Sequence, residues 1–396
     1  MPSTQVYLGC NLTENPIYLQ FYEAWFPSLL VVGAPGSWKS LSISRSLIET
    51  LINDGWTCIY VTITADWMGI QRPNANELDI RTLKFFHSRW FLDEAEWQTH
   101  GINASRITLL LSPFWRGNLK EVEEVYGLKT LRWQIPIWNV MLEAVQDFYG
   151  AESMLDAAYF KDIRELWEDL RSKKTNGKEF IHALLEKTQA LPSPSKEWGV
   201  KFATKISEWF EMKPDPILTD ENMLEPLLSR EGRLLLLYFP QEEITAIESA
   251  TLATFIYTLM DICGKVYRQK GIKFCIIVDD VGIWSHHKRS LQAFEALIQR
   301  KGRKMGMLRA LIAQTDDDLS GSTIADSSRT PTFDFRIDAT INNVEIGGFE
   351  CPRGGAMFLH LRKRLYTRHG PKSYRPLLFV SRPPLTAYQF VRKGQK

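Results

Sequence analysis

The stretch that decides the fold is LLVVGAPGSWKS, residues 29–40. Its first four residues are apolar, and the run stops at a glycine, which is typical of a buried parallel strand followed by a tight turn. The residues after it predict a helix from Ser40 to about Asn53 that ends near Gly55. A glycine-rich turn between a strand and a helix is the setting of a phosphate-binding loop, in which successive backbone N–H groups point at the phosphates.

The side chains of this loop are those that binding of ATP with Mg²⁺ requires. We expect Lys39 to neutralise the β- and γ-phosphates and Ser40 to place its hydroxyl on Mg²⁺. Trp38 stands where a glycine normally precedes the lysine, so its ring must point out of the loop, because no space beside a triphosphate would take it. The predicted nucleotide-binding residues are Gly33, Ala34, Pro35, Gly36, Ser37, Trp38, Lys39, Ser40 and Leu41.

A second apolar run, IIVDD at residues 276–280, ends in two aspartates. Mg²⁺ prefers hard oxygen ligands, so we expect Asp279 to hold the metal through water and Asp280 to orient the attacking water. Alone, such a pair would be interpreted as an acidic strand end in a solvated loop, but the preceding phosphate-binding loop favours the paired roles. Gln314 closes the next apolar strand and is either a sensor of the γ-phosphate or an ordinary strand-end residue.

Strand and helix signals alternate along the chain. The pattern predicts an α/β fold, a P-loop NTPase core with a doubly wound, mostly parallel central sheet and a helical insertion. The predicted helices after the insertion cover about 244–267 and 291–302. The predicted strands that follow the first are 58–63, 107–111, 234–239, 274–278, 310–314, 333–337 and 356–361.

The region from 115 to 229 has a different character, because strand signals are absent and apolar residues recur at helical spacing. In PIWNVMLEAVQDFYG, Pro136 opens an expected helix whose apolar positions run from Ile137 to Phe148. We therefore predict three units: residues 1–114 with an N-terminal β-hairpin and the P-loop half of the core, 115–229 as an all-helical insertion, and 230–396 as the second half with a basic C-terminal stretch.

Composition indicates an ordinary globular protein. Of 396 residues, 44% are hydrophobic and 24% are charged. Five scattered cysteines without metal-ligand spacing indicate reduced thiols in a cytoplasmic protein. No window reaches the roughly 18 apolar residues of a membrane span, so we expect no direct membrane insertion and any attachment to come through a partner protein.

Charge is unevenly distributed although the net charge is only +2. No acidic residue follows Glu350, which indicates either a basic surface that meets a polyanion or a solvated tail. The basic residues after that point are Arg353, Arg362, Lys363, Arg364, Arg368, Lys372, Arg375, Arg382, Arg392, Lys393 and Lys396.

Several segments, in this order, resemble the FtsK/HerA superfamily of DNA-pumping ATPases, which includes the type IV secretion and conjugation ATPases. YLGCNLTENPIYLQF resembles the short β-hairpin that these proteins place ahead of the loop, and ITLLLSPF resembles the strand before their helical insertion. IIVDD followed by RKGRKMGMLRALIAQT is the most specific part, and RTPTFDFRI and GGAMFL resemble the closing strands.

The resemblance implies a homo-hexameric ring with ATP at subunit interfaces and double-stranded DNA through the centre. It places Lys39, Ser40, Asp279, Asp280 and Gln314 in the roles given above. Arg300, Arg303 and Arg336 are candidate arginine fingers for a neighbouring subunit, although each taken singly is more typical of a surface residue or a salt-bridge partner. Among them we favour Arg303, because RKGRK lies just before the strand that ends at Gln314. Trp38 and Asp280, where a glutamate is more usual, depart from the family pattern.

The resulting expectation is an ATP-driven translocase of double-stranded DNA, acting in packaging, mobilisation or DNA processing with a loading or membrane-anchored partner. Two alternatives share the same core. One is a secretion or assembly ATPase that acts on protein, and the other is a nucleotide-binding scaffold with weak or no turnover, which the departures at Trp38 and Asp280 would explain.

Overall fold

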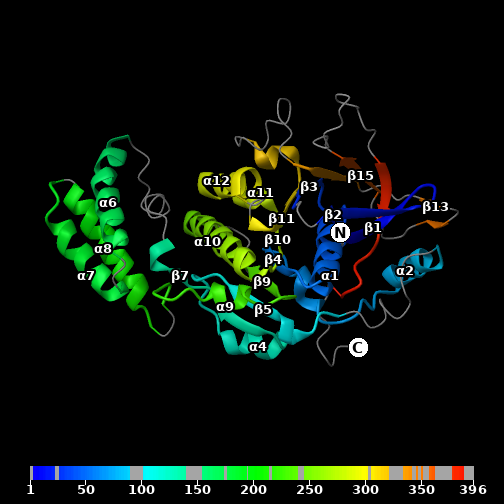
Figure 1. Cartoon of the computed structure of the whole chain (residues 1–396), viewed down its shortest axis with the longest axis horizontal. Helices are drawn as coiled ribbons and strands as arrows, with labels where there is room; N and C mark the ends of the chain where they lie inside the picture. Colours follow the sequence, from blue (N-terminus) through cyan, green and yellow to red (C-terminus); the bar gives the residue numbers. More distant parts are fainter. Residues whose placement is uncertain are drawn as a thin grey trace.

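The computed structural model describes residues 3–22, 26–89, 101–139, 154–173, 176–193, 195–213, 216–239, 245–301, 305–320, 333–340, 345–346, 349–350, 356–361 and 377–387. A 12-stranded sheet runs through its centre (Figure 1). Its strands are β1 (Ser3–Asn11), β2 (Pro16–Tyr22), β3 (Ser28–Gly33), β4 (Thr57–Thr62), β5 (Ile107–Leu111), β6 (Lys129–Arg132), β9 (Leu234–Tyr238), β10 (Phe274–Val278), β11 (Met307–Ala313), β12 (Phe335–Ala339), β15 (Ala356–Leu361) and β16 (Leu377–Ser381).

Across the sheet the strand order is β2-β1-β16-β15-β12-β3-β11-β10-β4-β9-β5-β6. From β12 to β6 every neighbouring pair is parallel, whereas β15, β16, β1 and β2 add an antiparallel edge. The predicted fold class, α/β with a mostly parallel sheet, is confirmed. Because the parallel strands share one direction, the carboxyl ends of β3, β4, β10 and β11 meet at a single edge of the sheet.

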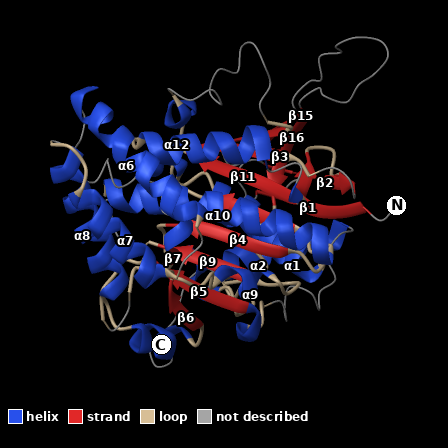
Figure 2. Ribbon diagram, turned by 60° about the vertical axis from the view of Figure 1, so that its left-hand side comes forward, coloured by secondary structure: helices blue, strands red, loops and turns tan. Residues whose placement is uncertain are grey.

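Helices cover both faces of this sheet (Figure 2), which explains why its central strands β4, β5 and β10 are buried along their whole length rather than at alternate positions. In β10, Phe274, Ile276 and Val278 belong to one buried cluster, which they share with α10 (Ala246–Lys270). Cys275 and Ile277 face the other cluster, which includes α1 (Arg45–Asn53). The sheet is therefore doubly wound, as the sequence predicts.

The remaining elements connect the strands. The other α-helices are α2 (Glu77–Arg89), α4 (Leu119–Tyr126), α6 (Met154–Ser172), α7 (Gly177–Gln189), α8 (Ser195–Glu211), α9 (Leu224–Leu228), α11 (Val281–Ser285) and α12 (Lys288–Glu295). The 3₁₀ and π-helical segments are η1 (Ser40–Ser44), η2 (Asp66–Gly69), η3 (Ala104–Arg106), η4 (Ile137–Asn139), η5 (Ala296–Lys301) and η7 (Asp316–Leu319). Two small pairs stand apart from the main sheet, β7 (Ile135–Pro136) with β8 (Leu218–Thr219) and β13 (Glu345–Ile346) with β14 (Phe349–Glu350).

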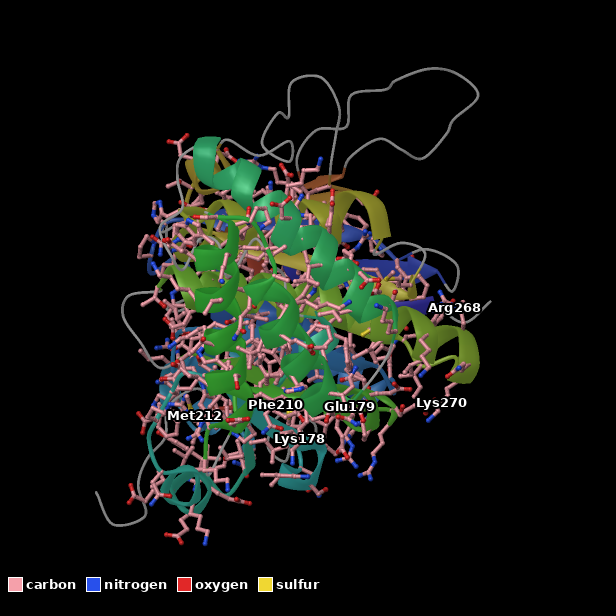
Figure 3. All side chains as sticks on the ribbon, turned by 90° about the vertical axis from the view of Figure 1, so that its left-hand side faces the viewer. Lys178, Glu179, Phe210, Met212, Arg268 and Lys270 are labelled. Carbon is pink, nitrogen blue, oxygen red and sulfur yellow. The ribbon has the colours of Figure 1, made fainter. Side chains whose placement is uncertain are left out.

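Helices α6, α7 and α8 form a bundle beside the sheet (Figure 1). Trp167 of α6 stands edge-on to Phe180 of α7 and Phe202 of α8, with ring centroids 4.8 Å and 5.4 Å apart. These side chains belong to the same buried cluster as one face of the sheet. Figure 3 looks onto the bundle, where Lys178 and Glu179 lie in the first turn of α7 close to Phe210 in the last turn of α8; a Cβ on Gly177 would lie 2.6 Å from the Phe210 ring.

The prediction that residues 115–229 are all helical is wrong at both ends of the region. Strand β6 extends the parallel sheet beside β5, and β7 pairs with β8. Sequence periodicity missed β6 because it has four residues, and polar Lys129 and Arg132 form its ends. Pro136 lies in β7 rather than opening a helix; Ile137–Asn139 form a 3₁₀ turn, and 140–150 lie outside the described residues.

The structure also bears on the cysteines and on the helices that could span a membrane. Cys10, Cys58, Cys263 and Cys275 are free and buried, while Cys351 lies outside the described residues. No helix among the described residues is long and apolar enough to cross a membrane.

Candidate functional site

The loop between β3 and η1 has the conformation that a phosphate-binding loop needs. Gly33 ends β3 so close to β12 that a Cβ on it would lie 2.8 Å from the Cβ of Ala339. Gly36 adopts a left-handed conformation with φ 82°, and a Cβ there would meet no atom within 4 Å. The backbone at Gly36 therefore borders open space at the start of a helix that runs from Ser40 through Asn53.

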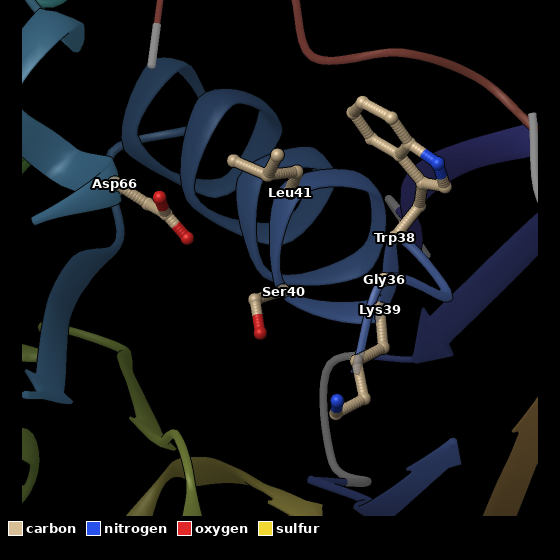
Figure 4. A pocket seen from close by; sticks show the side chains of 6 residues that line it. All are labelled: Gly36, Trp38, Lys39, Ser40, Leu41 and Asp66. Atoms are coloured by element: carbon tan, nitrogen blue, oxygen red, sulfur yellow. The ribbon is translucent and has the colours of Figure 1, made fainter. Parts of the chain in front are cut away.

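Trp38 keeps the left-handed backbone that a glycine would adopt at this position, with φ 64°. For a residue with a side chain this conformation costs about 1–2 kcal/mol. Its half-buried ring packs against the buried cluster on the α1 face of the sheet. In Figure 4 the ring points away from the side chains of Lys39 and Ser40, which confirms that it leaves the loop.

Lys39 and Ser40 turn their side chains to the opposite side of the loop from the Trp38 ring (Figure 4). Lys39 is 6% exposed, and its Nζ lies 3.5 Å from the carbonyl oxygen of Ala34. The Ser40 hydroxyl donates to Oδ1 of Asp279 at 2.9 Å. The loop borders a pocket of about 310 Å³, lined by Gly36, Trp38, Lys39, Ser40, Leu41 and Asp66.

Asp279 follows β10 directly and is fully buried. Its Oδ1 accepts from Ser40 and from the backbone N–H of Asp280, and its Oδ2 accepts from the Tyr60 hydroxyl at 2.6 Å. Burial, and then the charge of Asp280, raise the pKa of Asp279 to about 7. A divalent cation beside this carboxylate would offset the cost of ionising it in a buried place, which suits a metal ligand.

Asp280 and Gln314 also meet at this edge. Asp280 has a left-handed backbone, φ 51°, and its carboxylate hydrogen-bonds the Gln314 side chain. Burial raises the pKa of Asp280, while that hydrogen bond and the charge of Lys39 act in the opposite direction. Strand β11 lies between β3 and β10, so the end of β11 brings Gln314 between the loop and the acid pair.

The structure adds residues that sequence reasoning missed. Tyr60 contacts Asp279 because β4 pairs with β10 in parallel register, and no local motif marks this contact. Asp318 accepts from the backbone N–H groups of Gln314 at 2.6 Å and of Thr315 at 3.1 Å, and so fixes the turn after β11. Asp66, three residues after the predicted strand 58–63, lines the pocket; the one signal for it is an acid shortly after an apolar run.

The structure describes the three candidate arginine fingers to different extents. Arg303 lies outside the described residues, and of Arg300 only the backbone, in η5, is described. Arg336 of β12 is paired within its own chain, with Asp316 and Asp338 each 2.8 Å away. The structure thus gives Arg336 an intrachain role, namely tying β12 to η7.

The basic C-terminal stretch is only partly described, and there the interpretation as a basic surface is wrong. Arg382 is 2% exposed and forms a 3.0 Å ion pair with buried Glu49 of α1. Thr386 donates to the other Glu49 oxygen through its N–H and its hydroxyl. The other ten basic residues of the stretch lie outside the described residues.

The donor set at this edge fits a magnesium-bound nucleoside triphosphate. The Ser40 hydroxyl and Oδ1 of Asp279 lie next to each other, and both are hard oxygens of the kind that Mg²⁺ binds. Lys39 supplies a compact cation, and the helix that begins at Ser40 directs its N-terminal N–H groups at the same place. Elsewhere in the described part of the chain, no group of three or more His, Cys, Asp or Glu side chains could hold a metal ion.

A scan against protein-family models finds no match, and a search of curated proteins finds none either. Among solved structures, VirB4 of Thermoanaerobacter pseudethanolicus is 10% identical with a TM-score of 0.49, covering 85% of this chain and 84% of that one. The plasmid coupling protein TrwB in complex with the ATP analogue ADPNP is 15% identical with a TM-score of 0.42, covering 93% and 90%.

The pCW3 conjugation coupling protein TcpA is 9% identical with a TM-score of 0.32, covering 96% of this chain and 65% of that one. At these identities and TM-scores, the function of the chain is to be sought in the geometry of its own site.

Proposed function

We propose that this chain binds ATP with Mg²⁺ and hydrolyses it as a motor of the FtsK/HerA type. The observation that carries the proposal is the meeting of Lys39, Ser40, Asp279, Asp280 and Gln314 at one edge of the parallel sheet, although they come from three separate segments. Ser40 hydrogen-bonds Asp279, Gln314 hydrogen-bonds Asp280, and the charge of Lys39 acts on Asp280, so these five residues are linked by contacts within the chain.

In this proposal Lys39 neutralises the phosphates, and Ser40 and Asp279 hold the metal ion. Bound Mg²⁺ supplies charge that stabilises the transferring phosphoryl group. Asp280 orients the attacking water and receives its proton, while the Gln314 amide holds the Asp280 carboxylate in place. Asp280 stands where a glutamate is more usual, and its side chain is one methylene shorter. Its left-handed backbone sets the direction of this shorter side chain.

The work that we assign to hydrolysis is translocation of double-stranded DNA by a homo-hexameric ring, loaded by a partner protein. Arg303 of each subunit would act on the nucleotide of its neighbour, and such trans arginines are worth about 10³–10⁵ in rate. The basic C-terminal residues outside the described part of the chain would contribute contacts to DNA phosphates.

The experiment that tests the proposal is ATP hydrolysis by the purified protein with and without linear duplex DNA. Wild type should hydrolyse Mg-ATP and be stimulated by DNA, and Lys39→Ala should abolish turnover. Lys178→Ala, which removes an exposed lysine of the helical bundle, is the matched control and should behave as wild type. Hydrolysis that Lys39→Ala leaves intact refutes the site; hydrolysis that DNA does not stimulate favours a motor acting on protein.

The ring is tested by mixing variants. Arg303→Ala and Lys39→Ala subunits are each inactive alone in this proposal. Mixed rings contain interfaces with an intact loop on one side and an intact arginine on the other, and these should regain part of the activity. Absence of rescue, with both variants still assembling, would exclude a trans role for Arg303.

One observation favours a second candidate, a nucleotide-binding scaffold with weak turnover. Trp38 stands where a glycine normally lets the backbone pass close to the phosphates, and a Cβ at that position crowds the path. Binding of Mg-ATP without measurable hydrolysis, with or without DNA, would support this candidate over the motor.

A further inference from the structure

Tyr60 lies on the same face of the sheet as the predicted metal ligands. Successive side chains of a strand alternate between faces, and Tyr60 pairs in register with Ile277, two residues before Asp279. Tyr60 and Ile277 both belong to the cluster on the face that α1 covers, the helix that continues from Ser40. Strand register therefore brings the Tyr60 hydroxyl to the Asp279 carboxylate, where it contacts Oδ2.

The hydrogen bonds divide the two oxygens of this carboxylate between separate tasks. Tyr60 donates to Oδ2 at 2.6 Å, whereas Oδ1 accepts from Ser40 at 2.9 Å. The Tyr60 side chain is 2% exposed and Asp279 is fully buried, so the hydroxyl and Oδ2 meet away from bulk solvent. With Oδ2 fixed by the phenol, the carboxylate cannot rotate freely, and Oδ1 stays directed at the Ser40 hydroxyl.

We propose that Tyr60 is a positioning residue that sets the affinity of the site for Mg²⁺ by fixing the Asp279 carboxylate. The proposal rests on the proposed function, since it assumes that Ser40 and Asp279 hold the metal. Partners that orient a metal ligand from behind are worth roughly 10–100-fold in metal affinity or activity. Tyr60 itself touches neither nucleotide nor metal.

The test is Tyr60→Phe, which removes the hydroxyl and keeps the ring. The first measurement is the Mg²⁺ concentration that gives half-maximal ATP hydrolysis at saturating ATP, which should rise roughly 10-fold or more. The second does not depend on turnover: it is the Mg²⁺ dependence of the rise in Tm that ADP produces. That dependence should shift to higher Mg²⁺ in the variant, while the rise with ADP and EDTA stays as in wild type.

Tyr238→Phe is the matched control, because it removes a hydroxyl from the end of the neighbouring strand β9, opposite Thr62 of β4. Both Mg²⁺ dependences should be those of wild type. Tyr60→His returns a ring N–H donor and should recover part of the Mg²⁺ affinity, and it also serves as the second variant if Tyr60→Phe does not fold. Circular dichroism checks that each variant is folded.

The outcomes separate the two proposals. Wild type that shows no Mg²⁺-dependent effect of nucleotide on Tm overturns the proposed function and the role of Tyr60 with it. Wild type with a clear Mg²⁺ dependence that Tyr60→Phe leaves unchanged overturns the role of Tyr60 alone. A shifted dependence in Tyr60→Phe, partly restored by Tyr60→His and absent in Tyr238→Phe, supports it.

Discussion

At the scale of single residues, Trp38 combines two opposing effects. Its left-handed backbone costs about 1–2 kcal/mol, whereas its half-buried ring gains free energy by packing on the cluster beneath α1. Both effects act on the same loop, so removing the ring alone and removing the Cβ as well should have different consequences. A pair of variants separates them.

Trp38→Ala loses the packing and keeps most of the strain, while Trp38→Gly loses the packing and relieves the strain. We expect the glycine variant to be more stable than the alanine variant by about 1 kcal/mol, measured by chemical denaturation. It should also bind ATP at least as tightly as wild type in a titration calorimeter. Equal stability of the two variants would show that the loop relaxes when the ring is gone.

The two aspartates after β10 should differ in what their loss removes. In the proposed function, Asp279→Asn weakens a metal ligand, so Mg²⁺-dependent nucleotide binding and hydrolysis should both fall. Asp280→Asn keeps the proposed metal ligands and removes the proposed base, so hydrolysis should drop roughly 10²–10⁴-fold while Mg-ATP still binds. Equilibrium binding and single-turnover rates of the pair decide this, and loss of binding in Asp280→Asn would argue against its role as base.

Residues whose roles follow from a local string could be predicted from the sequence, and the others could not. Lys39 and Ser40 come straight from the loop, and Asp279 comes from an acid after an apolar run. Tyr60 depends on which strand lies beside β10 and in which register, which a single sequence does not specify. The sequence shows that Trp38 departs from the usual glycine of the loop, but its left-handed φ is visible only in the backbone of the structure.

At the scale of elements, η7 holds the end of β11 that carries Gln314. Asp318 accepts from the N–H groups of Gln314 and Thr315, and the Thr315 hydroxyl donates to its other oxygen at 3.0 Å. Its carboxylate also lies against Gly282 of α11, so the turn is held between β11 and the helix that follows Asp280. The position of Gln314 is thereby tied to that of Asp280.

Asp318→Ala should release this turn. We expect a loss of stability of about 0.5–2 kcal/mol, as for removal of a capping side chain, together with a fall in hydrolysis rate. Mg-ATP binding should change little, because the loop after β3 and Asp279 are untouched. Asp317→Ala, an exposed acid of the same turn, is the control. A rate equal to wild type in Asp318→Ala would show that Gln314 does not depend on the turn.

Long apolar strands and long helices could be predicted, and short edge elements could not. Strands β3, β5 and β10 coincide closely with their predicted ranges because both their faces are buried. Strand β6 shows no apolar run because only part of it is buried at the sheet edge. Strand β16 is not predicted from the sequence, because it is a short apolar run inside a stretch whose basic residues indicate a charged surface or tail.

At the scale of the whole molecule, the C-terminal segment packs against α1, the helix that continues from Ser40. Arg382 follows β16 and donates to the Tyr7 carbonyl as well as to Glu49, so it joins the N-terminal hairpin, α1 and the last strand. Arg45 of α1 contacts both Thr386 and the backbone carbonyl of Asp66 beside the pocket. These buried polar contacts connect three distant parts of the chain beneath the candidate site.

Breaking this ion pair should therefore be costly. Glu49→Gln leaves the buried Arg382 guanidinium without its counter-charge, and loss of one partner of a buried pair costs about 3–5 kcal/mol. The double variant Glu49→Gln with Arg382→Gln should recover part of that loss, because the Arg382 charge is removed too; recovery should stay incomplete, because buried Arg45 also interacts with the Glu49 charge. Denaturation midpoints measure both, and a single variant as stable as wild type would show that solvent reaches the pair.

The buried state of Arg382 also narrows the prediction for DNA binding. Arg382 is engaged with Glu49 and cannot contribute to a salt-dependent contact, so any contribution of the C-terminal stretch must come from its other basic residues, of which three lie beyond Arg382. Removing residues 389–396 deletes Arg392, Lys393 and Lys396. Each phosphate contact contributes about −0.9 to the slope of log K against log salt on duplex DNA, so the slope should shrink by up to about 3.

The truncation is best paired with a full-length variant in which Arg392, Lys393 and Lys396 become glutamine. Both proteins should show the same reduced slope and the same Tm as wild type, because the contacts of Arg382 and Thr386 with α1 remain intact in each. A reduced slope in the truncation alone would assign the effect to chain length rather than charge. An unchanged slope in both would show that these residues make no phosphate contacts and that DNA binding has to be sought elsewhere on the protein.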